Sequence, residues 1–308
     1  MMQAFISAQG LVKHYGNTLA LDNVSFEVYQ NEILGFIGPD GAGKSTLFEI
    51  LTTLLIPDAG EASINGMDIH KDYGKIRASI GFMPGKFSLY QDLTVQENLS
   101  FFANIFGSSI EENYHLIKGI YELLKPFANR KAGALSGGMK QKLALCCALI
   151  HKPLALFLDE PTTGVDAVSR TEFWDNLMQI RDSGIPIVVS TPYMDEATRC
   201  DRVAMIHNGR IMKLDTPDNI IKGYDGKLLS ITCKDRQKPK ALLQNEAAIT
   251  SLYSFGDALH ISLNNTDAST LKLISSKLEQ GMDSPYQIKE VFPIFEDCFL
   301  QLMGQMKK

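Results

Sequence analysis

The fold is decided by Gly38-Pro39-Asp40-Gly41-Ala42-Gly43-Lys44-Ser45-Thr46, a stretch with the phosphate-loop pattern G-x-x-x-x-G-K-S. It follows the apolar run Ile33–Ile37, which is typical of a buried strand, and it opens a segment from Ser45 to about Leu54 that is predicted to be helical. A chance glycine-rich turn is the alternative, and the surrounding strand and helix argue against it. The stretch therefore predicts an α/β fold with a phosphate-binding loop between a strand and a helix.

The residue types of this loop suit a phosphate and its metal ion. The glycines let successive backbone N–H groups turn toward one point, where the helix N-terminus adds partial positive charge. Lys44 is expected to bridge the outer phosphates, and the Ser45 hydroxyl is expected to bind Mg²⁺, which prefers oxygen ligands. The other loop residues expected to contact the phosphates are Gly38, Asp40, Gly41, Ala42, Gly43 and Thr46.

Two carboxylates follow a second buried strand. The unbroken apolar run Leu154–Leu158 is typical of a strand covered on both faces, and it ends in Asp159 and Glu160. In open α/β sheets ligands bind at the carboxyl ends of the strands, which is the edge that the phosphate loop also occupies. Asp159 is therefore expected to hold Mg²⁺, directly or through water, and Glu160 to orient or deprotonate an attacking water. A solvated Asp-Glu turn is the alternative, which the phosphate loop makes less attractive.

Two further helices have clear starts. Thr94 and Glu97 form a capping box, and the helix after it carries apolar residues at 95, 99, 102 and 106 on one face, which predicts core packing. Ser136 is a plausible N-cap of a helix that runs to about Ile150 and stops before Pro153. The start of this second helix is a further place where an anion would be favoured.

Composition limits the class of protein. The 308 residues suffice for one large or two modest domains, and 45% hydrophobic and 21% charged residues are ordinary for a globular protein. The formal charge of -5 gives no general attraction to nucleic acid, so no nucleic-acid partner is expected. The five cysteines have no metal-ligand spacing and are expected to be reduced thiols in a cytosolic protein. No signal peptide is expected at the N-terminus, and the longest apolar stretch, 143–158, is interrupted by polar residues and a proline.

Residues 3–222 resemble the nucleotide-binding subunit of an ATP-binding cassette transporter. The most specific motif is Leu135-Ser136-Gly137-Gly138-Met139-Lys140-Gln141, which is similar to the signature sequence of that family. Tyr15 matches the aromatic residue that stacks on adenine, and Gly164-Val165-Asp166 matches a loop that bridges two subunits. The resemblance implies a P-loop NTPase cassette over residues 1–222, with a mixed sheet core and a helical subdomain at about 86–150.

The resemblance also implies partners and ligands. Two cassettes are expected to pack head to tail, each ATP lying with Mg²⁺ between one phosphate loop and the other subunit's signature. That second contact would come from Ser136, Gly137, Gly138, Gln141 and Asp166. Integral membrane permease subunits would anchor the pair to the cytoplasmic face of the inner membrane. The second cassette could be another copy of this chain or a different one.

Two positions depart from the family pattern. Gly85 stands where the family usually has a glutamine near the magnesium and the attacking water, and Pro192 stands where it usually has a histidine at the γ-phosphate. Proline can neither donate a hydrogen bond nor carry charge, and losing one such donor typically costs about 10²- to 10³-fold in rate. We therefore expect slow hydrolysis at this chain's own site. In the alternative reading neighbouring residues compensate, and Gln91 is one candidate for the missing glutamine.

The pattern changes in residues 223–308. It predicts strands over 227–233, 249–254, 258–263 and 286–292, helices over 238–247 and 268–280, and a last helix from about residue 293. That order is a split βαβ arrangement, so a small α+β domain is expected. His260 is expected to be a packing or surface residue. The segment 293–300 is similar to a C-terminal appendage of bacterial exporter cassettes, which suggests dimerisation or regulation.

Three functions remain open at this stage. The first is a transport ATPase, and the segments 82–90 and 191–197 are similar to exporters of the drug-efflux type. The second is a binding module that holds ATP and completes a partner's site without turning over its own. The third is a cassette protein of DNA repair or translation, which would need a long coiled-coil insertion or a second cassette that this sequence lacks. The transported substrate is not encoded in a cassette.

Overall fold

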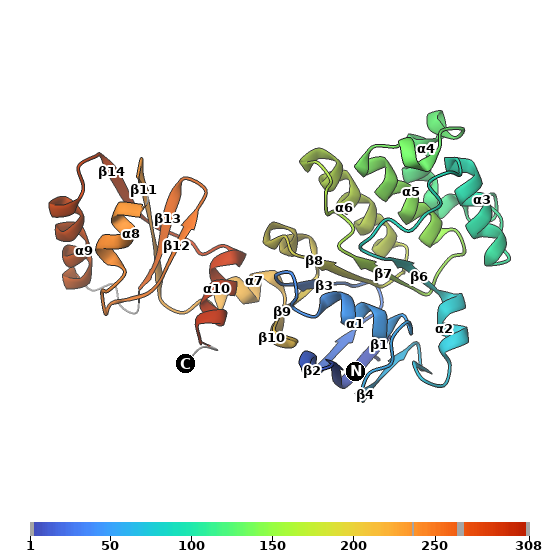
Figure 1. Ribbon diagram of the computed structural model, residues 1–308, viewed down its shortest axis with the longest axis horizontal. Helices are drawn as coiled ribbons and strands as arrows, with labels where there is room; N and C mark the ends of the chain where they lie inside the picture. Colours follow the sequence, from blue (N-terminus) through green and yellow to red (C-terminus); the bar gives the residue numbers. More distant parts are fainter. Residues whose placement is uncertain (1–2, 236, 264–267, 306–308) are drawn as a thin grey trace. The chain divides into compact units, whose positions relative to one another are not determined.

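The computed structural model describes residues 3–235, 237–263 and 268–305. The chain divides into two compact units, residues 1–217 and 218–308, and each is described by itself. Figure 1 shows the elements of both units in chain order by colour. Among the described residues, no helix combines the length and the apolar character needed to cross a membrane. In the described part of the chain none of the five cysteines forms a disulfide.

A six-stranded sheet with the order β10-β9-β3-β8-β7-β6 forms the centre of the first unit. Strand β3 pairs in parallel with β8 and β9, and β7 pairs in parallel with β6 and β8, so these strands end at the same edge. Every residue of β3, β7 and β8 is buried, as expected for strands covered on both faces. Only β10 runs antiparallel to its neighbour. The bounds are β3 Ile33–Ile37, β6 Ile80–Met83, β7 Ala155–Asp159, β8 Ile187–Thr191, β9 Arg202–His207 and β10 Arg210–Asp215.

A second, antiparallel sheet has the order β2-β1-β4-β5. Its first hairpin turns at Gly16 and Asn17, where Tyr15 pairs with Thr18. Register shifts interrupt the pairing of β1 with β2 and with β4. The bounds are β1 Ile6–Tyr15, β2 Thr18–Val28, β4 Ala59–Ile64 and β5 Met67–Asp68.

Helix α1, Lys44–Leu51, packs its apolar side chains into the core that the two sheets share. The Phe48 ring meets Phe36 of β3 and Phe157 of β7 edge to face, with centroids 6.2 and 6.4 Å apart. Such aromatic pairs add to the burial energy. The helix ends three residues before its predicted end, where the Thr52 hydroxyl donates to the Phe48 carbonyl. The phosphate loop is therefore held by a strand and a helix that are both packed in the core.

The remaining helices of the first unit include three, α3 to α5, within residues 86–150, where a helical subdomain is expected. The Thr94 capping box is confirmed, because the Thr94 side chain accepts from Glu97 N–H and the Glu97 side chain accepts from Thr94 N–H. Ser136 is confirmed as an N-cap, with its hydroxyl 3.3 Å from Met139 N. The bounds are α2 Tyr73–Ser79, α3 Val95–Ile105, α4 Tyr114–Leu124, α5 Gly137–Leu149 and α6 Ala167–Asp182, with 3-10 turns η1 Lys125–Phe127, η2 Ala132–Ala134 and η3 Met194–Arg199.

The second unit has the predicted split βαβ arrangement. Its sheet has the order β12-β13-β11-β14 with every pairing antiparallel, and side chains of α8 and α9 share one core cluster with the sheet. His260 packs on the Phe255 ring, and its Nδ1 lies 2.9 Å from an Asp297 oxygen, which confirms a packing role. The bounds are α7 Pro217–Lys222, β11 Lys227–Cys233, α8 Gln237–Leu243, β12 Ile249–Phe255, β13 Ala258–Leu263, α9 Ala268–Gly281, β14 Tyr286–Val291 and α10 Phe295–Gln305.

Candidate nucleotide-binding site

A cleft of about 730 Å³ lies over the carboxyl ends of β3, β6 and β7. It brings together segments that are far apart in the sequence: the β1–β2 hairpin, the phosphate loop, the segment after β6 and the end of β7. Its lining residues are Tyr15, Thr18, Leu19, Ala20, Asp40, Gly41, Gly43, Lys44, Ser45, Thr46, Glu49, Leu54, Phe82, Pro84, Gly85, Lys86, Asp159 and Glu160. Gly38 and Ala42 belong to the same loop but are not in the lining.

The phosphate loop requires its glycines for two different reasons. Gly41 and Gly43 have φ angles of 76° and 100°, in the left-handed region that L side chains rarely adopt. Gly38 is constrained by packing, because a Cβ atom there would lie 2.0 Å from the Ile206 carbonyl oxygen. The loop thus exposes backbone N–H groups at the N-terminus of α1, a geometry suited to an anion.

Lys44 holds a central position in the cleft. Its side chain is only 3% exposed, and Nζ donates to the Gly38 carbonyl at 2.9 Å and to the Pro39 carbonyl at 3.1 Å. The same nitrogen lies 3.2 Å from Oε1 of Glu160. The ammonium group is therefore oriented between the phosphate loop and the second carboxylate, where a bound phosphate chain would meet it.

The Asp159 carboxylate and the Glu160 backbone are both held by Ser190, a residue that the sequence did not single out. The hydroxyl of Ser190, a fully buried residue near the end of β8, donates to Oδ1 of Asp159 and accepts from the backbone N–H of Glu160 at 3.0 Å. Glu160 itself has a φ angle of 49°, in the left-handed region. For a residue with a Cβ atom this conformation costs about 1 kcal/mol, and such strain is common at functional sites.

The donors in the cleft fit Mg²⁺. Ser45 and Asp159 both line it, and each offers the kind of oxygen ligand that Mg²⁺ prefers. Within the described ranges no group of three or more His, Cys, Asp or Glu side chains could hold a metal ion. A cation bound by few protein oxygens, with phosphate and water completing its shell, is the usual arrangement for Mg²⁺.

The two departures noted in the sequence lie differently. Gly85 lines the cleft, and a Cβ atom there would be 3.5 Å from Oδ2 of Asp159, so this position faces the carboxylate without a side chain. Pro192 directly follows β8 and is not in the lining. The suggestion that Gln91 replaces the missing glutamine is wrong. Gln91 lies outside the lining and packs against Gly133, whose N–H donates to the Gln91 carbonyl at 2.9 Å.

The signature residues form a separate surface. Ser136, Gly137, Gly138 and Gln141 are all outside the lining of the cleft. A Cβ atom at Gly137 would lie 3.1 Å from the Gly164 carbonyl, and one at Gly138 would lie 2.8 Å from the Ser169 hydroxyl. Asp166 caps α6 by accepting from Ser169 N–H at 3.0 Å, and this bond lowers the pKa of the Asp166 carboxyl. The start of α5 and the loop at residues 164–166 are therefore packed together.

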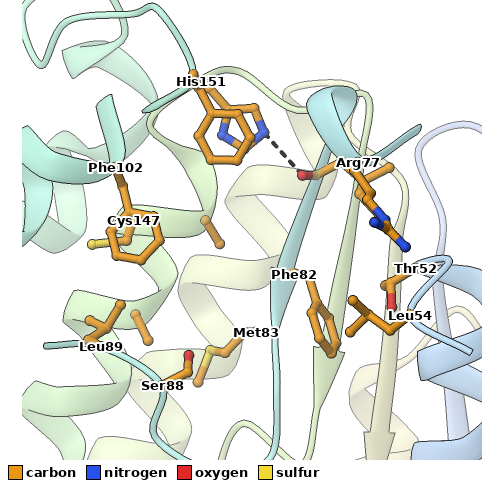
Figure 2. A pocket seen from close by; sticks show the side chains of 14 residues that line it. Thr52, Leu54, Arg77, Phe82, Met83, Ser88, Leu89, Phe102, Cys147 and His151 are labelled. Carbon is orange, nitrogen blue, oxygen red and sulfur yellow. Dashed lines mark hydrogen bonds between the residues drawn. The ribbon is translucent and has the colours of Figure 1, made fainter. Parts of the chain in front are cut away.

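An apolar cavity of about 170 Å³ lies beside the cleft, among β6, α3 and α5. Figure 2 shows Phe102, Leu89 and Met83 on its walls, with His151 hydrogen-bonded across it to a carbonyl. That contact joins His151 Nε2 to the Ile80 carbonyl at 3.1 Å, and burial lowers the pKa of His151. Leu54 and Phe82 line both the cavity and the cleft, and Leu54 is 58% exposed.

The parallel sheet, the phosphate loop and the two carboxylates define a P-loop nucleotide-binding cassette. The family model described as ABC transporter matches residues 21–163. The chain is 37% identical to the Nod factor export ATP-binding protein I of Rhizobium sp. (strain N33), with 99% of each chain covered. It is 42% identical over 71% of its length to the probable multidrug ABC transporter ATP-binding protein YbhF of Escherichia coli, and it spans 38% of the length of that relative.

Solved structures agree with these relatives. A dimeric MJ0796 cassette bound to ADP and Pi has a TM-score of 0.62 at 28% identity, covering 68% of this chain and 98% of that one. The cbiO1 protein from Clostridium perfringens, described as part of the complex cbiONQ, has a TM-score of 0.64 at 25% identity, covering 71% of this chain and 91% of that one. The chain belongs to the ABC transporter family, as an ATP-binding subunit similar to those of exporters.

Proposed function

We propose that this chain couples ATP binding and hydrolysis, at an interface with a second cassette, to export of a substrate through separate membrane subunits. We further propose that hydrolysis at its own site is attenuated. One observation carries the second point: the phosphate-holding groups are complete, whereas Gly85 faces Asp159 without a side chain. Pro192 adds to it, because proline has no donor for a transition-state charge.

The residues of the cleft have separate proposed roles. The phosphate loop and Lys44 bind the phosphates, and Ser45 and Asp159 would hold Mg²⁺, which supplies charge neutralisation when bound. Tyr15, half exposed at the edge of the cleft, stacks on the adenine. Glu160 orients the attacking water and accepts its proton. Retention of Glu160 argues for a slow site rather than a dead one.

A second cassette is proposed as the first partner. The signature residues lie outside the cleft, and the start of α5 is a helix N-terminus suited to an anion. An ATP held by another subunit is the ligand that this surface fits, with Asp166 close by. The dimeric MJ0796 cassette supports this proposal by analogy. We assign residues 1–222 to the cassette domain and residues 223–308 to a domain for dimerisation or regulation.

Membrane subunits are the second proposed partner, which places the chain at the cytoplasmic face of the inner membrane. The names of the Nod factor export and YbhF relatives support export, with drug-efflux systems as the nearest type. The apolar cavity beside the cleft is suited to an apolar side chain from such a subunit, because Leu54 at its rim is exposed. Leu54 and Phe82 line both the cavity and the cleft. A side chain bound in the cavity would therefore contact residues that also line the nucleotide site.

The alternative function is a nucleotide-binding module that completes the partner's site and does not hydrolyse its own ATP. Gly85 and Pro192 favour it, because both lack the group that the family uses for hydrolysis. The two functions share every binding residue and differ only in turnover.

Turnover and binding measured together distinguish them. The purified chain is assayed for ATP turnover with Mg²⁺, alone and as Glu160→Gln, and ATP binding is measured directly. Slow turnover above the Glu160→Gln control supports the attenuated ATPase, and tight binding with turnover equal to the control supports the non-hydrolysing module. Brisk turnover that rises with protein concentration and vanishes in the variant would refute attenuation, and absent binding would refute both functions.

A further inference from the structure

Glu196 is a buried carboxylate that the nucleotide chemistry does not use. Its side chain, in the 3-10 turn η3, is 3% exposed. Oε1 accepts from the Thr162 hydroxyl at 2.8 Å, Oε2 accepts from the Thr191 hydroxyl at 2.6 Å, and Arg170 Nε lies 3.5 Å from Oε1. Burying a carboxylate is costly unless donors surround it, so the arrangement of these donors is specific.

Each of the three donor residues lies close to a segment that the proposed function uses. Thr162 lies two residues after Glu160, and Arg170 follows Asp166 by one turn of α6, its N–H donating to the Asp166 carbonyl at 2.9 Å. Thr191 ends β8, and its carbonyl lies 3.4 Å from the N–H of Gly38, the first residue of the phosphate loop. The Glu196 carboxylate therefore connects three segments. They are the end of β8 next to the phosphate loop, the segment after Glu160, and helix α6, which Asp166 caps.

Stabilisation of the η3 turn alone does not explain this geometry. Asp175 of α6 and Arg199 of η3 join the same two elements with a 3.1 Å ion pair at the surface, where both side chains are exposed. Surface pairs of that kind contribute little. Glu196 differs because it is buried and accepts hydrogen bonds from two hydroxyls. One belongs to Thr162 in the loop after β7, and the other belongs to Thr191, the last residue of β8.

We propose that Glu196 is a positioning residue that links the nucleotide cleft to the loop at residues 161–166. Nucleotide at the phosphate loop fixes Gly38 and hence the Thr191 end of β8. Glu196 transmits that order to Thr162 and, through Arg170, to the segment carrying Asp166. The inference rests on the proposed nucleotide binding of the cleft, and it adds a route by which a filled site prepares the surface that meets a partner.

Hydrogen exchange of the full chain with and without Mg-ATP tests this link. In the wild type we expect Mg-ATP to slow amide exchange about tenfold both in the phosphate loop and over residues 161–166. Glu196→Gln keeps the size of the side chain and loses its charge and one acceptor. It should retain the slowing in the phosphate loop and show less than about twofold slowing over residues 161–166.

Two further variants keep the test decisive. Thr162→Val, which removes one donor to Glu196 at the loop itself, should reproduce the selective loss. Asp175→Asn, a carboxylate change between the same two elements, should behave as wild type.

The remaining outcomes each have one meaning. Slowing over residues 161–166 that persists in Glu196→Gln, or is absent in the wild type, overturns the link. Loss of slowing in the phosphate loop of Glu196→Gln also overturns it, because Glu196 would then support the cleft as a whole. If the wild-type phosphate loop shows no slowing with Mg-ATP, nucleotide binding itself fails, and the proposed function falls with it.

Discussion

The two sides of the cleft are built differently. On one side the phosphate loop has its full set of residues, and Lys44 is buried with three oxygen neighbours. On the other side Gly85 faces the Asp159 carboxylate without a side chain, and Pro192 follows β8 outside the cleft lining. From this difference we expect that holding a nucleotide and hydrolysing it depend on separate parts of one cleft.

Packing follows the same division. The phosphate loop is fixed by α1, whose Phe48 ring meets aromatic rings of two strands in the core. The segment after β6 is exposed at Gly85 and Lys86, as the phosphate loop is at Asp40 and Gly41, but the next helix after it, α3, begins only at Val95. The phosphate loop therefore runs directly into a helix packed in the core, and the segment at Gly85 does not.

The largest expected effect comes from restoring the two polar side chains that the family usually has at positions 85 and 192. Gly85→Gln combined with Pro192→His should raise turnover by about 10²- to 10³-fold, the usual contribution of a well-placed donor to a transition state. A Cβ atom at position 85 has no neighbour closer than 3.4 Å, so the backbone there accepts a residue with a side chain. Steady-state kinetics measure the gain, which should disappear when Glu160→Gln is added. Unchanged turnover would mean that attenuation has another cause.

Removing the holding side is the second test. Lys44→Ala should weaken ATP binding by about 10²-fold, because charge-assisted hydrogen bonds to phosphate contribute about 1.5 to 3 kcal/mol each. Equilibrium titration with ATP measures the change. Lys75→Ala, which removes an exposed lysine paired with Asp72, is the matched control and should bind as wild type. Equal affinities for wild type and Lys44→Ala would erase the contrast between the two sides.

Ser190 links the Asp159 carboxylate to the backbone of Glu160, and its removal should have a smaller effect. Ser190→Ala should lower the free energy of unfolding by about 2 kcal/mol, because a buried Asp159 oxygen loses its hydroxyl donor. Urea unfolding measures the loss. Ser183→Ala, which removes a hydroxyl bond to the Ile180 carbonyl at the end of α6, should cost less than about 1 kcal/mol. Equal losses in both variants would show that the Ser190 bond to Asp159 is unimportant.

A change outside the cleft should affect stability alone. Thr94→Ala removes the N-cap of α3 and should lower the free energy of unfolding by about 1 kcal/mol. Affinity for ATP and turnover at a temperature well below unfolding should stay as in the wild type. Altered ATP affinity in this variant would mean that the helical region also contributes to nucleotide binding. The two sides of the cleft would then not be sufficient to explain binding.

Much of the fold could be predicted because short apolar runs lie between strong breakers. Strands β11 and β13 begin and end at the predicted residues for this reason. Strands β1 and β2 are harder to predict, because register shifts interrupt the alternation that identifies a strand. Helix α8 ends at Leu243, earlier than predicted, where Glu246 N–H closes a turn onto the Leu243 carbonyl.

The site was predictable where its motifs are continuous in sequence. Lys44, Ser45, Asp159 and Glu160 meet in one cleft as expected. Contacts between distant segments were missed, and the Ser190 bond to Asp159 spans 31 positions. A signal for it exists, since polar residues end β8 as they end β7. Gln91 was misplaced because sequence distance from Gly85 says nothing about where the intervening loop folds.

Because the backbone of Glu160 is left-handed, stability of the fold and the activity proposed for this residue favour different amino acids at position 160. A glycine at position 160 would adopt that angle without strain and could stabilise the fold, yet it would remove the carboxylate. Selection for thermal stability alone would therefore favour loss of the carboxylate that we propose activates water. A stabilised laboratory variant of this cassette should be checked there first, since a higher melting temperature can accompany a silent active site.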